Sequence, residues 1–465
     1  MIIPSSFNEQ TVFVLGLGRS GRSVAHSLFK AGAHVLAWDD QEAARHTAKI
    51  QGIPLANLAS LDWKNVHHLF LSPGIPHHYP APHPLVLKAQ SVGLHPTSDL
   101  EILYRSQPNA RYVGITGTNG KSTTTSLIGH ILKESGRLVE VGGNLGIPAM
   151  DLNPLEKDGI YVLEVSSYQL ETSPNLHFNI SILLNITPDH LDRHGGMDGY
   201  IRAKKLIYKN ARPQDTLVIS VDDLHCLKIY ESLKSSEKIP LLPISVNKVL
   251  SDGIYVKEGI LYENTHPVLN VKQLERLKGQ HNWQNIAAAY GALRSLGLEP
   301  ESIAKGISSF PGLAHRQEVV ARHKNVLFVN DSKATNAEAA EKVLECYQGS
   351  PLYWILGGRP KEGGITTLTP YFSKIKHAFL FGEAKSSFLP TLQGNLPLTL
   401  CDTLEEAVSR ASRLAFDNQE QGAVVLLAPA CASWDQFSDF EARGNAFCMA
   451  VKTAIEEENS SRRST

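Results

Sequence analysis

Short apolar runs alternate with longer segments of helical spacing along most of this chain, and polar loops separate them. TVFVL (11–15) and HVLAWDD (34–40) enclose a helical segment near the amino end, and VLFVN (326–330) begins a similar series later in the chain. Strands that alternate with helices are typical of parallel sheets covered by helices. The pattern therefore predicts an α/β fold made of consecutive sheet-containing units.

Two breaks in this pattern predict three domains. Near Asp99 the chain becomes helical before a new strand, RYVGI (111–115), and PGL (311–313) interrupts the pattern again. A chain of 465 residues is long enough for about three domains of ordinary size. The predicted domains are residues 1–99, 100–312 and 313–465.

Composition and charge exclude several classes of protein. The formal net charge is −1, so it gives no support for binding to nucleic acid or to an anionic membrane. The five cysteines are far apart and form no C-x-x-C pair, which argues against a disulfide framework and against a cysteine metal cluster. No apolar run approaches the roughly 18 residues of a membrane-spanning helix. The start, MIIPSSFNEQ, lacks the basic region of a signal peptide, so we expect a cytoplasmic protein.

A glycine-rich turn, GLGRSG (16–21), follows the first predicted strand and opens a helix, and Asp39 ends the next strand. Glycines in such a turn let phosphates approach the backbone, and the amino end of a helix favours an anion. The motif predicts a nucleotide with a diphosphate, but it leaves NAD, FAD and a UDP-sugar open. A turn that serves only helix–strand packing is the alternative interpretation.

A second candidate phosphate loop lies in VGITGTNGKSTTT (113–125), although its register is unusual. The commonest loop, G-x-x-x-x-G-K-[ST], requires a glycine where this chain has Ile115. The loop still offers consecutive backbone N–H groups ahead of a helix, a point charge on Lys121 and a hydroxyl on Ser122 that can face Mg²⁺. Two phosphate sites in successive domains predict two phosphorylated ligands.

Three ionisable side chains follow in the same predicted domain. Glu164 ends an apolar run, His190 follows the next run, and Lys204 lies in a helical segment. A carboxylate and a neutral imidazole can bind Mg²⁺ or Mn²⁺ when phosphates complete the shell. Each residue also has a plainer interpretation: a cap for Glu164, a hydrogen-bonded loop histidine for His190, and a solvated helix face for Lys204 and Lys205. The i, i+4 spacing of His190 and His194 is weak evidence for a metal.

The third predicted domain carries further charged loops. His315-Arg316 and NDSKATN (330–336) could clamp a nucleotide, with Arg316 suited to bidentate phosphate contact. Lys361 is flanked by glycines that let the backbone approach a small ligand. The alternative interpretation is a charged rim of solvated loops.

These motifs together resemble the Mur ligase family, and the resemblance spans nearly the whole chain. TGTNGKST (116–123) is similar to the ATP loop of that family, with its working glycines at 117 and 120. Glu164, Asp189-His190, HNxxN (281–285) and His315-Arg316 match as well. The resemblance implies a Rossmann-like first domain, a central ATPase-like domain with a mostly parallel sheet, and a Rossmann-like third domain.

Within the family, GLGRSG, NDSKATN and PACASWDQFSDFEARG (429–444) resemble the members that add D-glutamate to UDP-N-acetylmuramoyl-L-alanine. The implied reaction is an ATP-dependent amide ligation in peptidoglycan precursor synthesis. ATP phosphorylates the terminal carboxylate, the amine of D-glutamate attacks the acyl phosphate, and ADP and phosphate leave. The resemblance implies Mg²⁺ or Mn²⁺ as the metal and a cytoplasmic monomer without nucleic-acid or membrane partners.

The resemblance also implies the site residues. ATP would be bound by Gly117, Thr118, Asn119, Gly120, Lys121, Ser122, Thr123, Asn282, Asn285, Arg316 and Asp331. The metal ligands would be Ser122, Glu164, His190 and Lys204, the last as a carbamate formed with CO₂. The catalytic residues would be Lys121, Glu164, His190, Lys204 and Lys333.

The UDP-linked substrate would contact Gly18, Arg19, Ser20, Asp39, Ser72, Pro73, Gly74, Asn144, Ser166 and Gln169. D-Glutamate would contact Thr335, Lys361, Ser433 and Phe440. After Asp39 the chain has Asp40-Gln41 where some members have Thr-Arg, so the uracil contacts stay open.

Other functions remain open from the sequence alone. An L-alanine-adding or folylpolyglutamate enzyme of the same family is the nearest, and PACASWDQF argues against it. An NAD(P)-dependent oxidoreductase built on GLGRSG would leave the second phosphate loop unexplained. A nucleotide-binding regulator without catalysis would leave Lys121, Glu164, His190 and Lys204 unexplained.

Overall fold

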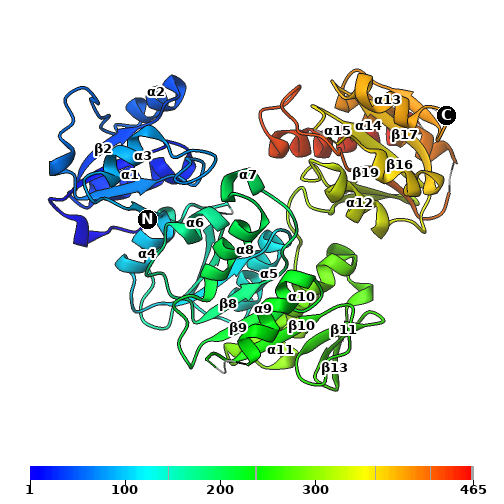
Figure 1. Cartoon of the computed structure of the whole chain (residues 1–465). Helices are drawn as coiled ribbons and strands as arrows, with labels where there is room; N and C mark the ends of the chain where they lie inside the picture. The colour runs from blue at the N-terminus through cyan, green and yellow to red at the C-terminus, as the bar shows by residue number, and fades with distance from the viewer. Residues whose placement is uncertain (145, 236–237, 362, 419, 462–465) are drawn as a thin grey trace. The chain divides into compact units, whose positions relative to one another are not determined.

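The computed structural model describes residues 1–144, 146–235, 238–361, 363–418 and 420–461 (Figure 1). These residues pack into two compact units. One contains Met1–Val271 and Asn282–Phe310, and the other contains Lys272–His281 and the chain from Pro311 onward. The finer division into three domains at residues 99 and 312 stays a prediction.

The first sheet is parallel throughout, and its four strands have the order β2-β1-β3-β4. The strands are β1 (Thr11–Leu15), β2 (His34–Trp38), β3 (His68–Leu71) and β4 (Pro96–Thr97). The helices are α1 (Arg19–Lys30), α2 (Glu42–Ile50), α3 (Pro84–Gln90) and α4 (Asp99–Ser106). In α1, Val24, Ala25 and Leu28 recur at helical spacing and are completely buried. This apolar face fixes α1 against the sheet, so GLGRSG lies directly at the end of β1.

The second sheet has nine strands in the order β13-β12-β11-β10-β9-β8-β5-β7-β6. Its pairs are parallel except for the antiparallel hairpins β11–β12 and β12–β13. The strands are β5 (Arg111–Thr116), β6 (Val139–Gly143), β7 (Ile160–Glu164), β8 (Ile180–Leu183), β9 (Thr216–Ser220), β10 (Leu241–Ser245), β11 (Ile254–Lys257), β12 (Ile260–Glu263) and β13 (His266–Asn270). The helices are α5 (Lys121–Glu134), α6 (Ser167–Glu171), α7 (Leu191–His194), α8 (Met197–Lys205), α9 (Leu224–Lys234), α10 (Gln280–Ser295) and α11 (Pro300–Ser309).

Helices hold the loops of this second sheet in place. The helix α5 packs against β5, β6 and β7. On α8, Tyr200 packs into one apolar cluster with Leu183 of β8 and Leu217 of β9. Because β7, β5 and β8 are neighbouring parallel strands, the loops after them meet at one edge of the sheet.

The third sheet has six strands in the order β14-β15-β19-β16-β17-β18, and only β14 is antiparallel to its neighbour. The strands are β14 (Glu318–His323), β15 (Val326–Asn330), β16 (Leu352–Gly357), β17 (Ile375–Phe381), β18 (Leu398–Leu400) and β19 (Ala423–Leu427). The helices are α12 (Ala337–Cys346), α13 (Lys385–Leu392), α14 (Leu404–Asn418) and α15 (Phe440–Ser461).

Apolar clusters cover both faces of this third sheet. Trp354 of β16 packs in the cluster that contains α12 and α13, whereas its neighbours Tyr353 and Ile355 pack in the cluster that contains α14 and α15. Strands buried on both faces are typical of parallel sheets between helices. The predicted α/β class is therefore confirmed. Among the described residues, none of the helices combines the length and the apolar character needed to cross a bilayer.

Candidate functional site

The second candidate phosphate loop joins β5 to α5, as its sequence context predicts. Gly120 has φ 87°, and a Cβ atom there would lie 2.2 Å from Asn285 Oδ1. A Cβ atom at Gly117 would lie 3.0 Å from Leu184 Cβ. Gly114 lies inside β5, where the missing side chain makes room for the ring of Phe178. The glycines that shape the loop are therefore Gly117 and Gly120, and the unusual register is a property of the loop rather than a defect.

Asn185, which follows β8, holds this loop through both its backbone and its side chain. Its carbonyl oxygen accepts a hydrogen bond from Thr118 N at 3.0 Å. Its Oδ1 accepts from Asn119 N at 2.8 Å, and its Nδ2 donates to Asn119 O at 3.1 Å. No spacing pattern pointed to Asn185, because it stands inside the apolar run NISILLNI.

Two asparagines of α10 support the loop from behind. Asn285 Oδ1 accepts a hydrogen bond from Thr124 Oγ1 at 3.2 Å, and Asn285 Nδ2 donates to Asn282 Oδ1 at 3.1 Å. Both asparagines are buried. The HNxxN segment therefore packs against the start of α5, next to the loop.

Lys121 and Lys204 reach the same backbone oxygen. Lys121 Nζ donates to Gly117 O and to Thr118 O, each at 2.9 Å. Lys204 Nζ donates to Gly117 O at 2.8 Å and lies 4.6 Å from the centre of the Tyr200 ring. The side chains of α5 and α8 thus converge on the loop.

The interpretation of Lys204 as part of a solvated helix face was wrong. Lys204 is 1% exposed, whereas Lys205 is exposed as expected. Burial lowers the pKa of Lys204 well below its ordinary value, and the nearby charge of Lys121 lowers this pKa further. A buried amine with a lowered pKa is partly neutral, so it can act as a nucleophile.

Glu164 offers an unused carboxylate oxygen beside the loop. It ends β7 and is 3% exposed, and its Oε1 accepts a hydrogen bond from Asn144 Nδ2 at 2.8 Å. Its Oε2 is buried, and among the described residues it has no hydrogen-bond partner. Because an unpaired buried polar atom is costly, such an oxygen is suited to a ligand that supplies the missing contact.

The two histidines at i, i+4 spacing have different environments. His190 is exposed in a left-handed conformation (φ 53°), and its Nε2 lies 3.4 Å from Asp189 Oδ2. Partial burial lowers the pKa of His190, Asp189 opposes this effect, and Lys121 adds to it. The imidazole of His190 is thus biased toward the neutral form that binds metals.

His194 is 2% exposed and belongs to a different network. Its Nε2 lies 2.9 Å from Ser167 Oγ, its Nδ1 lies 3.4 Å from Glu171 Oε1, and its ring stacks on Tyr168 with centroids 5.2 Å apart. Among the described residues, no three His, Cys, Asp or Glu side chains form a group that could hold a metal. A metal at His190 and Glu164 would therefore need further ligands of other kinds.

The glycines of GLGRSG have different local roles. A Cβ atom at Gly21 would overlap Gly16 O at 1.8 Å, and a Cβ atom at Gly16 would lie 2.7 Å from Ser72 Cβ. Ser72 Oγ donates to Gly16 O at 2.8 Å. A Cβ atom at Gly18 would meet nothing within 4 Å. Packing therefore requires Gly16 and Gly21, and the turn leaves open space at Gly18, where α1 begins.

Asp39 accepts hydrogen bonds from the backbone of this turn and from the backbone that follows β2. Its Oδ2 accepts from Leu17 N at 2.7 Å, and its Oδ1 accepts from Gln41 N at 2.8 Å. Arg19, next to Gly18, donates to the carbonyl oxygen of Gly146. The turn of the first sheet thus contacts the loop after β6.

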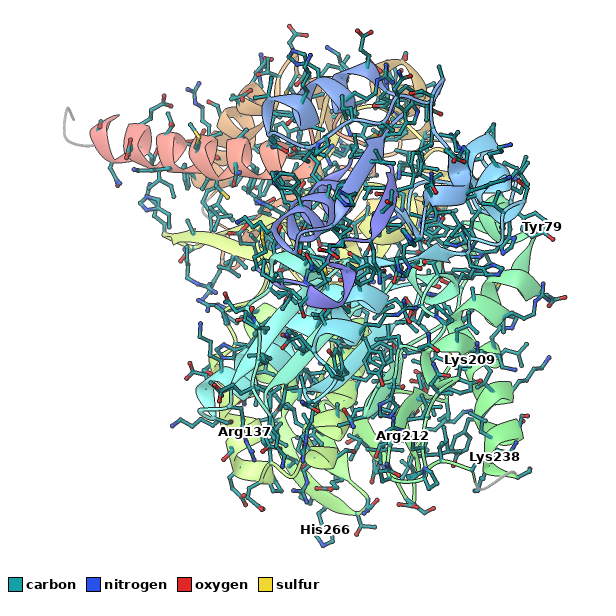
Figure 2. The ribbon with its side chains drawn as sticks, turned by 90° about the vertical axis from the view of Figure 1, so that its left-hand side faces the viewer. Tyr79, Arg137, Lys209, Arg212, Lys238 and His266 are labelled. Atoms are coloured by element: carbon teal, nitrogen blue, oxygen red, sulfur yellow. The ribbon has the colours of Figure 1, made fainter. Side chains whose placement is uncertain are left out.

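Further contacts join the loop after β3 to α7. Arg193 Nη1 donates to Gly74 O at 3.1 Å. Tyr79, labelled in Figure 2, packs over Gly195, since a Cβ atom there would lie 2.6 Å from the tyrosine ring. The loop that contains Ser72–Gly74 is therefore held against the chain that follows His190.

Both polar atoms of the Gln169 side-chain amide form hydrogen bonds within the protein. Its Oε1 accepts from Ser166 N at 3.1 Å in a capping box at the start of α6. Its Nε2 donates to Asp99 Oδ1 at 2.9 Å. Gln169 thus links α6 to α4, and the substrate contact predicted for it stays a prediction.

In the second unit, the predicted nucleotide residues lie around the end of β15. Asp331 is 7% exposed, and burial raises its pKa to about 7, although the charge of Arg316 opposes this shift. Lys333 N donates to His315 O at 3.1 Å. Lys333 Nζ lies 3.9 Å from the centre of the Phe440 ring. The structure therefore brings the His315-Arg316 and NDSKATN segments together.

The predicted D-glutamate residues lie in loops that follow three neighbouring strands. Thr335 follows β15, Lys361 follows β16, and Ser433 follows β19. Ser433 is 2% exposed, and Lys361 is exposed. Because the three strands are parallel, these loops share one edge of the sheet.

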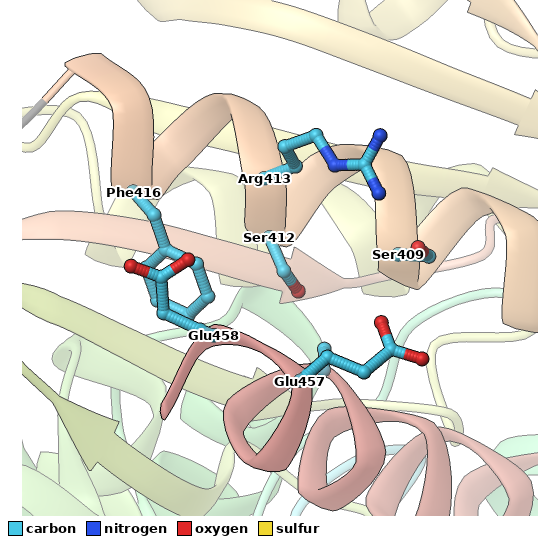
Figure 3. A pocket seen from close by; sticks show the side chains of 7 residues that line it. Ser409, Ser412, Arg413, Phe416, Glu457 and Glu458 are labelled. Atoms are coloured by element: carbon cyan, nitrogen blue, oxygen red, sulfur yellow. The ribbon is translucent and has the colours of Figure 1, made fainter. Parts of the chain in front are cut away.

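A groove of about 300 Å³ lies apart from these loops, between α14 and α15. Figure 3 shows Ser412, Arg413 and Phe416 on one helix and Glu457 and Glu458 on the other. None of the predicted site residues lines it. The groove is therefore not part of the candidate site.

Comparison with known proteins agrees with this geometry. The model of the Mur ligase middle domain matches residues 115–293, and that of the Mur ligase glutamate ligase domain matches residues 315–431. UDP-N-acetylmuramoylalanine–D-glutamate ligase of Paramagnetospirillum magneticum is 50% identical over 452 residues, which are 97% of this chain and 98% of the relative. The enzyme of the same name from Rhodospirillum rubrum is 46% identical over 94% of this chain and 93% of its own.

A solved structure shares the fold at much lower identity. Crystal structure I of MurF from Acinetobacter baumannii has a TM-score of 0.60 and 18% sequence identity, and the match covers 98% of this chain and 93% of that one. The family models and the relatives along nearly the full length confirm the predicted resemblance. This chain belongs to the Mur ligase family.

Proposed function

We propose that this chain joins D-glutamate to UDP-N-acetylmuramoyl-L-alanine in an ATP-dependent reaction of peptidoglycan precursor synthesis. Curated relatives that are 41–50% identical along nearly the whole chain have the name of this ligase. The observation that carries the proposal in the structure is the convergence of Lys121 and Lys204 on Gly117 O in the phosphate loop. A loop with consecutive backbone N–H groups and the charge of Lys121 is suited to bind the phosphates of ATP.

The reaction starts with a poor electrophile, because a carboxylate resists attack by an amine. Transfer of the γ-phosphoryl group of ATP to a carboxylate oxygen gives an acyl phosphate and ADP. The amine of D-glutamate then attacks the carbonyl carbon, loses a proton, and the tetrahedral intermediate releases phosphate as the amide forms. We assign Lys121 and Lys333 to binding the charged phosphates, where positioning and charge stabilisation carry most of the catalysis.

The residues around the loop fit a divalent cation. The unpaired Oε2 of Glu164 and the imidazole of His190 are suitable donors. We propose that Ser122, Glu164, His190 and carbamylated Lys204 hold Mg²⁺ or Mn²⁺. When bound, the cation neutralises negative charge on the transferring phosphoryl group.

Carbamylation of Lys204 explains how a lysine could serve a cation. The neutral amine attacks CO₂, a nitrogen–carbon bond forms, and a proton is released, which leaves an anionic carbamate. The burial and lowered pKa of Lys204 favour the neutral amine that this step requires. The modification places a negative charge beside the positive charge of Lys121, so it adds an attraction between opposite charges.

We assign the UDP part of the substrate to the turn at Gly18, Arg19 and Ser20, to Asp39 and to Ser72–Gly74. The muramoyl-alanine part would lie near Asn144, Ser166 and Gln169. Thr118 to Thr123, Asn282, Asn285, Arg316 and Asp331 would serve ATP, and D-glutamate would meet Thr335, Lys361, Ser433 and Phe440. We also propose that the enzyme is a cytoplasmic monomer.

Phosphate release from ATP tests this function. With UDP-N-acetylmuramoyl-L-alanine present, D-glutamate should support release, whereas L-glutamate and L-alanine should not. Release that depends on L-alanine, or release without any amino acid, would contradict the proposal.

A further inference from the structure

Arg443 is a completely buried arginine that no part of the proposed function uses. It lies in the first turns of α15, is 0% exposed, and is one of the largest fully buried side chains among the described residues. Burial lowers its pKa to about 10. The sequence offered only its place in the PACASWDQFSDFEARG motif.

The guanidinium of Arg443 binds oxygens of two separate loops. Nε donates to Ser332 Oγ at 3.0 Å, and Nη2 donates to Ser332 O at 2.8 Å. Nη1 donates to Cys431 O at 3.1 Å and to Ala432 O at 3.2 Å. All of these acceptors are uncharged.

Nη1 of Arg443 also approaches a third loop, the one that follows β16. Nη1 lies 3.5 Å from Gly357 O, the last residue of β16. A Cβ atom at Gly358 would lie 3.0 Å from this nitrogen and 2.3 Å from Ala432 O. Glycine at 358 therefore lets the guanidinium and the two loops approach one another.

The burial of the Arg443 charge indicates a specific role for this side chain. Among the described residues, no carboxylate forms an ion pair with Arg443 within 4 Å. A buried charge costs several kcal/mol in desolvation, and apolar residues of similar volume are often at least as stabilising. What an apolar residue cannot provide is a planar set of donors that fixes several oxygens at once.

The loops that Arg443 ties together are those assigned to the amino acid. Ser332 is three residues before Thr335, Gly357 is four before Lys361, and Ala432 precedes Ser433. Two further hydrogen bonds join the loop after β16 to the loop after β19. Arg359 N donates to Ala432 O at 2.9 Å, and Ala432 N donates to Arg359 O at 3.0 Å. Ser332 Oγ also donates to Phe440 O at 2.8 Å.

We propose that Arg443 is the positioning residue of the D-glutamate site, because its guanidinium holds the loops after β15, β16 and β19 in the arrangement that binds this amino acid. Arg443 acts through these loops and does not touch the substrate. This inference rests on the proposed function, since that function assigns the three loops to D-glutamate.

The test compares Arg443→Lys and Arg443→Met with wild type in the phosphate-release assay. Lysine keeps the positive charge but lacks the planar set of donors of the guanidinium, and methionine lacks both. We expect KM for D-glutamate to rise about threefold to tenfold with lysine and more than tenfold with methionine. KM for UDP-N-acetylmuramoyl-L-alanine should change less than twofold. Arg413→Ala, at an exposed arginine of α14, is the matched control and should leave all constants unchanged.

Hydrogen exchange provides a second measurement that does not depend on the reaction. In Arg443→Lys, amides of residues 331–335, 357–361 and 430–433 should exchange faster, while those of β17 and β18 should keep wild-type rates. The proposal is overturned if KM for D-glutamate stays within twofold of wild type in Arg443→Lys, or if both KM values rise by the same factor. Unchanged exchange in the three loops overturns it as well. If wild type shows no release with D-glutamate, the proposed function fails, and the exchange rates still decide whether Arg443 holds the loops. Should Arg443→Met fail to fold, Arg443→Lys carries the test.

Discussion

Lys204 Nζ and Lys121 Nζ both donate hydrogen bonds to the carbonyl oxygen of Gly117, at 2.8 and 2.9 Å. Burial lowers the pKa of Lys204, and the like charge of Lys121 at the same acceptor lowers this pKa further. The pair therefore contains one lysine suited to hold phosphate and one suited to chemical modification.

Replacement of Lys204 by alanine should lower kcat by about 100-fold or more, because the proposed ligand of the metal and its charge would be lost together. Lys205→Ala, at the exposed neighbour, is the matched control and should keep wild-type rates. Since only the neutral amine takes up CO₂, acidification through the lowered pKa of Lys204 should reduce the carbamate and the rate. ¹³C NMR of protein kept under ¹³CO₂ measures the carbamate directly. A wild-type rate in Lys204→Ala would contradict the assignment.

His190 is the amino-terminal cap of α7 and His194 lies within this helix, and their substitutions should affect different properties. The first should reduce activity, and the second should reduce stability. His190→Ala should lower kcat by about 100-fold with little change in Tm, because the ring is exposed and belongs to the candidate metal site. His194→Ala should cost about 1–3 kcal/mol of folding free energy, since it removes a buried hydrogen bond and a stacked ring. Steady-state kinetics and thermal unfolding of both variants decide the matter. The assignment fails if the two variants show the reverse pattern.

Alanine at position 120 should weaken ATP binding at least tenfold, because the new Cβ atom would displace Asn285 and strain a backbone with φ 87°. Gly136 also has a positive φ, 71°, but a Cβ atom there meets nothing within 4 Å. Gly136→Ala should therefore cost about 1 kcal/mol in stability without changing KM for ATP. Equal effects of both substitutions on KM for ATP would show that strain alone, and not the contact with Asn285, controls the loop.

Asp331 should make the stability of the second unit depend on pH. Its pKa is about 7 in the folded chain against an ordinary value of 3.8, so the folded chain keeps a proton that the unfolded chain has released. The resulting stabilisation is complete below the ordinary pKa and is lost as the pH rises to about 7. We expect Asp331→Asn to flatten this dependence, and Asp417→Asn, at an exposed site, to preserve it. Free energies from exchange of β15 amides at several pH values provide the measurement, and identical pH profiles for all three proteins would refute this origin of the dependence.

The fold class and the phosphate loop could be predicted from the sequence, because both depend on local patterns of residues. Strands, helices and turns alternate in order, and glycine is required wherever a Cβ atom would overlap a neighbour, as at Gly120. Lys204 could not be understood in this way. Its burial depends on how α8 docks on β8 and β9, and a lysine on a short helix has no local sign of that docking.

Other site residues escaped prediction for similar reasons. Asn185 stands inside an apolar run, so its polar side chain carries no spacing signal. Arg443 binds oxygens that are 12 and 111 residues away, and such contacts exist only after the sheet has formed. The i, i+4 spacing of His190 and His194 was only weak evidence for a metal, and φ 53° at His190 departs from regular helical geometry.

The hydrogen bonds of Asn185 with Thr118 and Asn119 have a consequence for nucleotide binding. Three hydrogen bonds within the chain hold the backbone of the loop at these two residues. Association with ATP should then lose little loop entropy, and the preorganised N–H groups can respond to phosphate without rearrangement. The shape of the phosphate loop should therefore be set when the chain folds, and not when ATP binds.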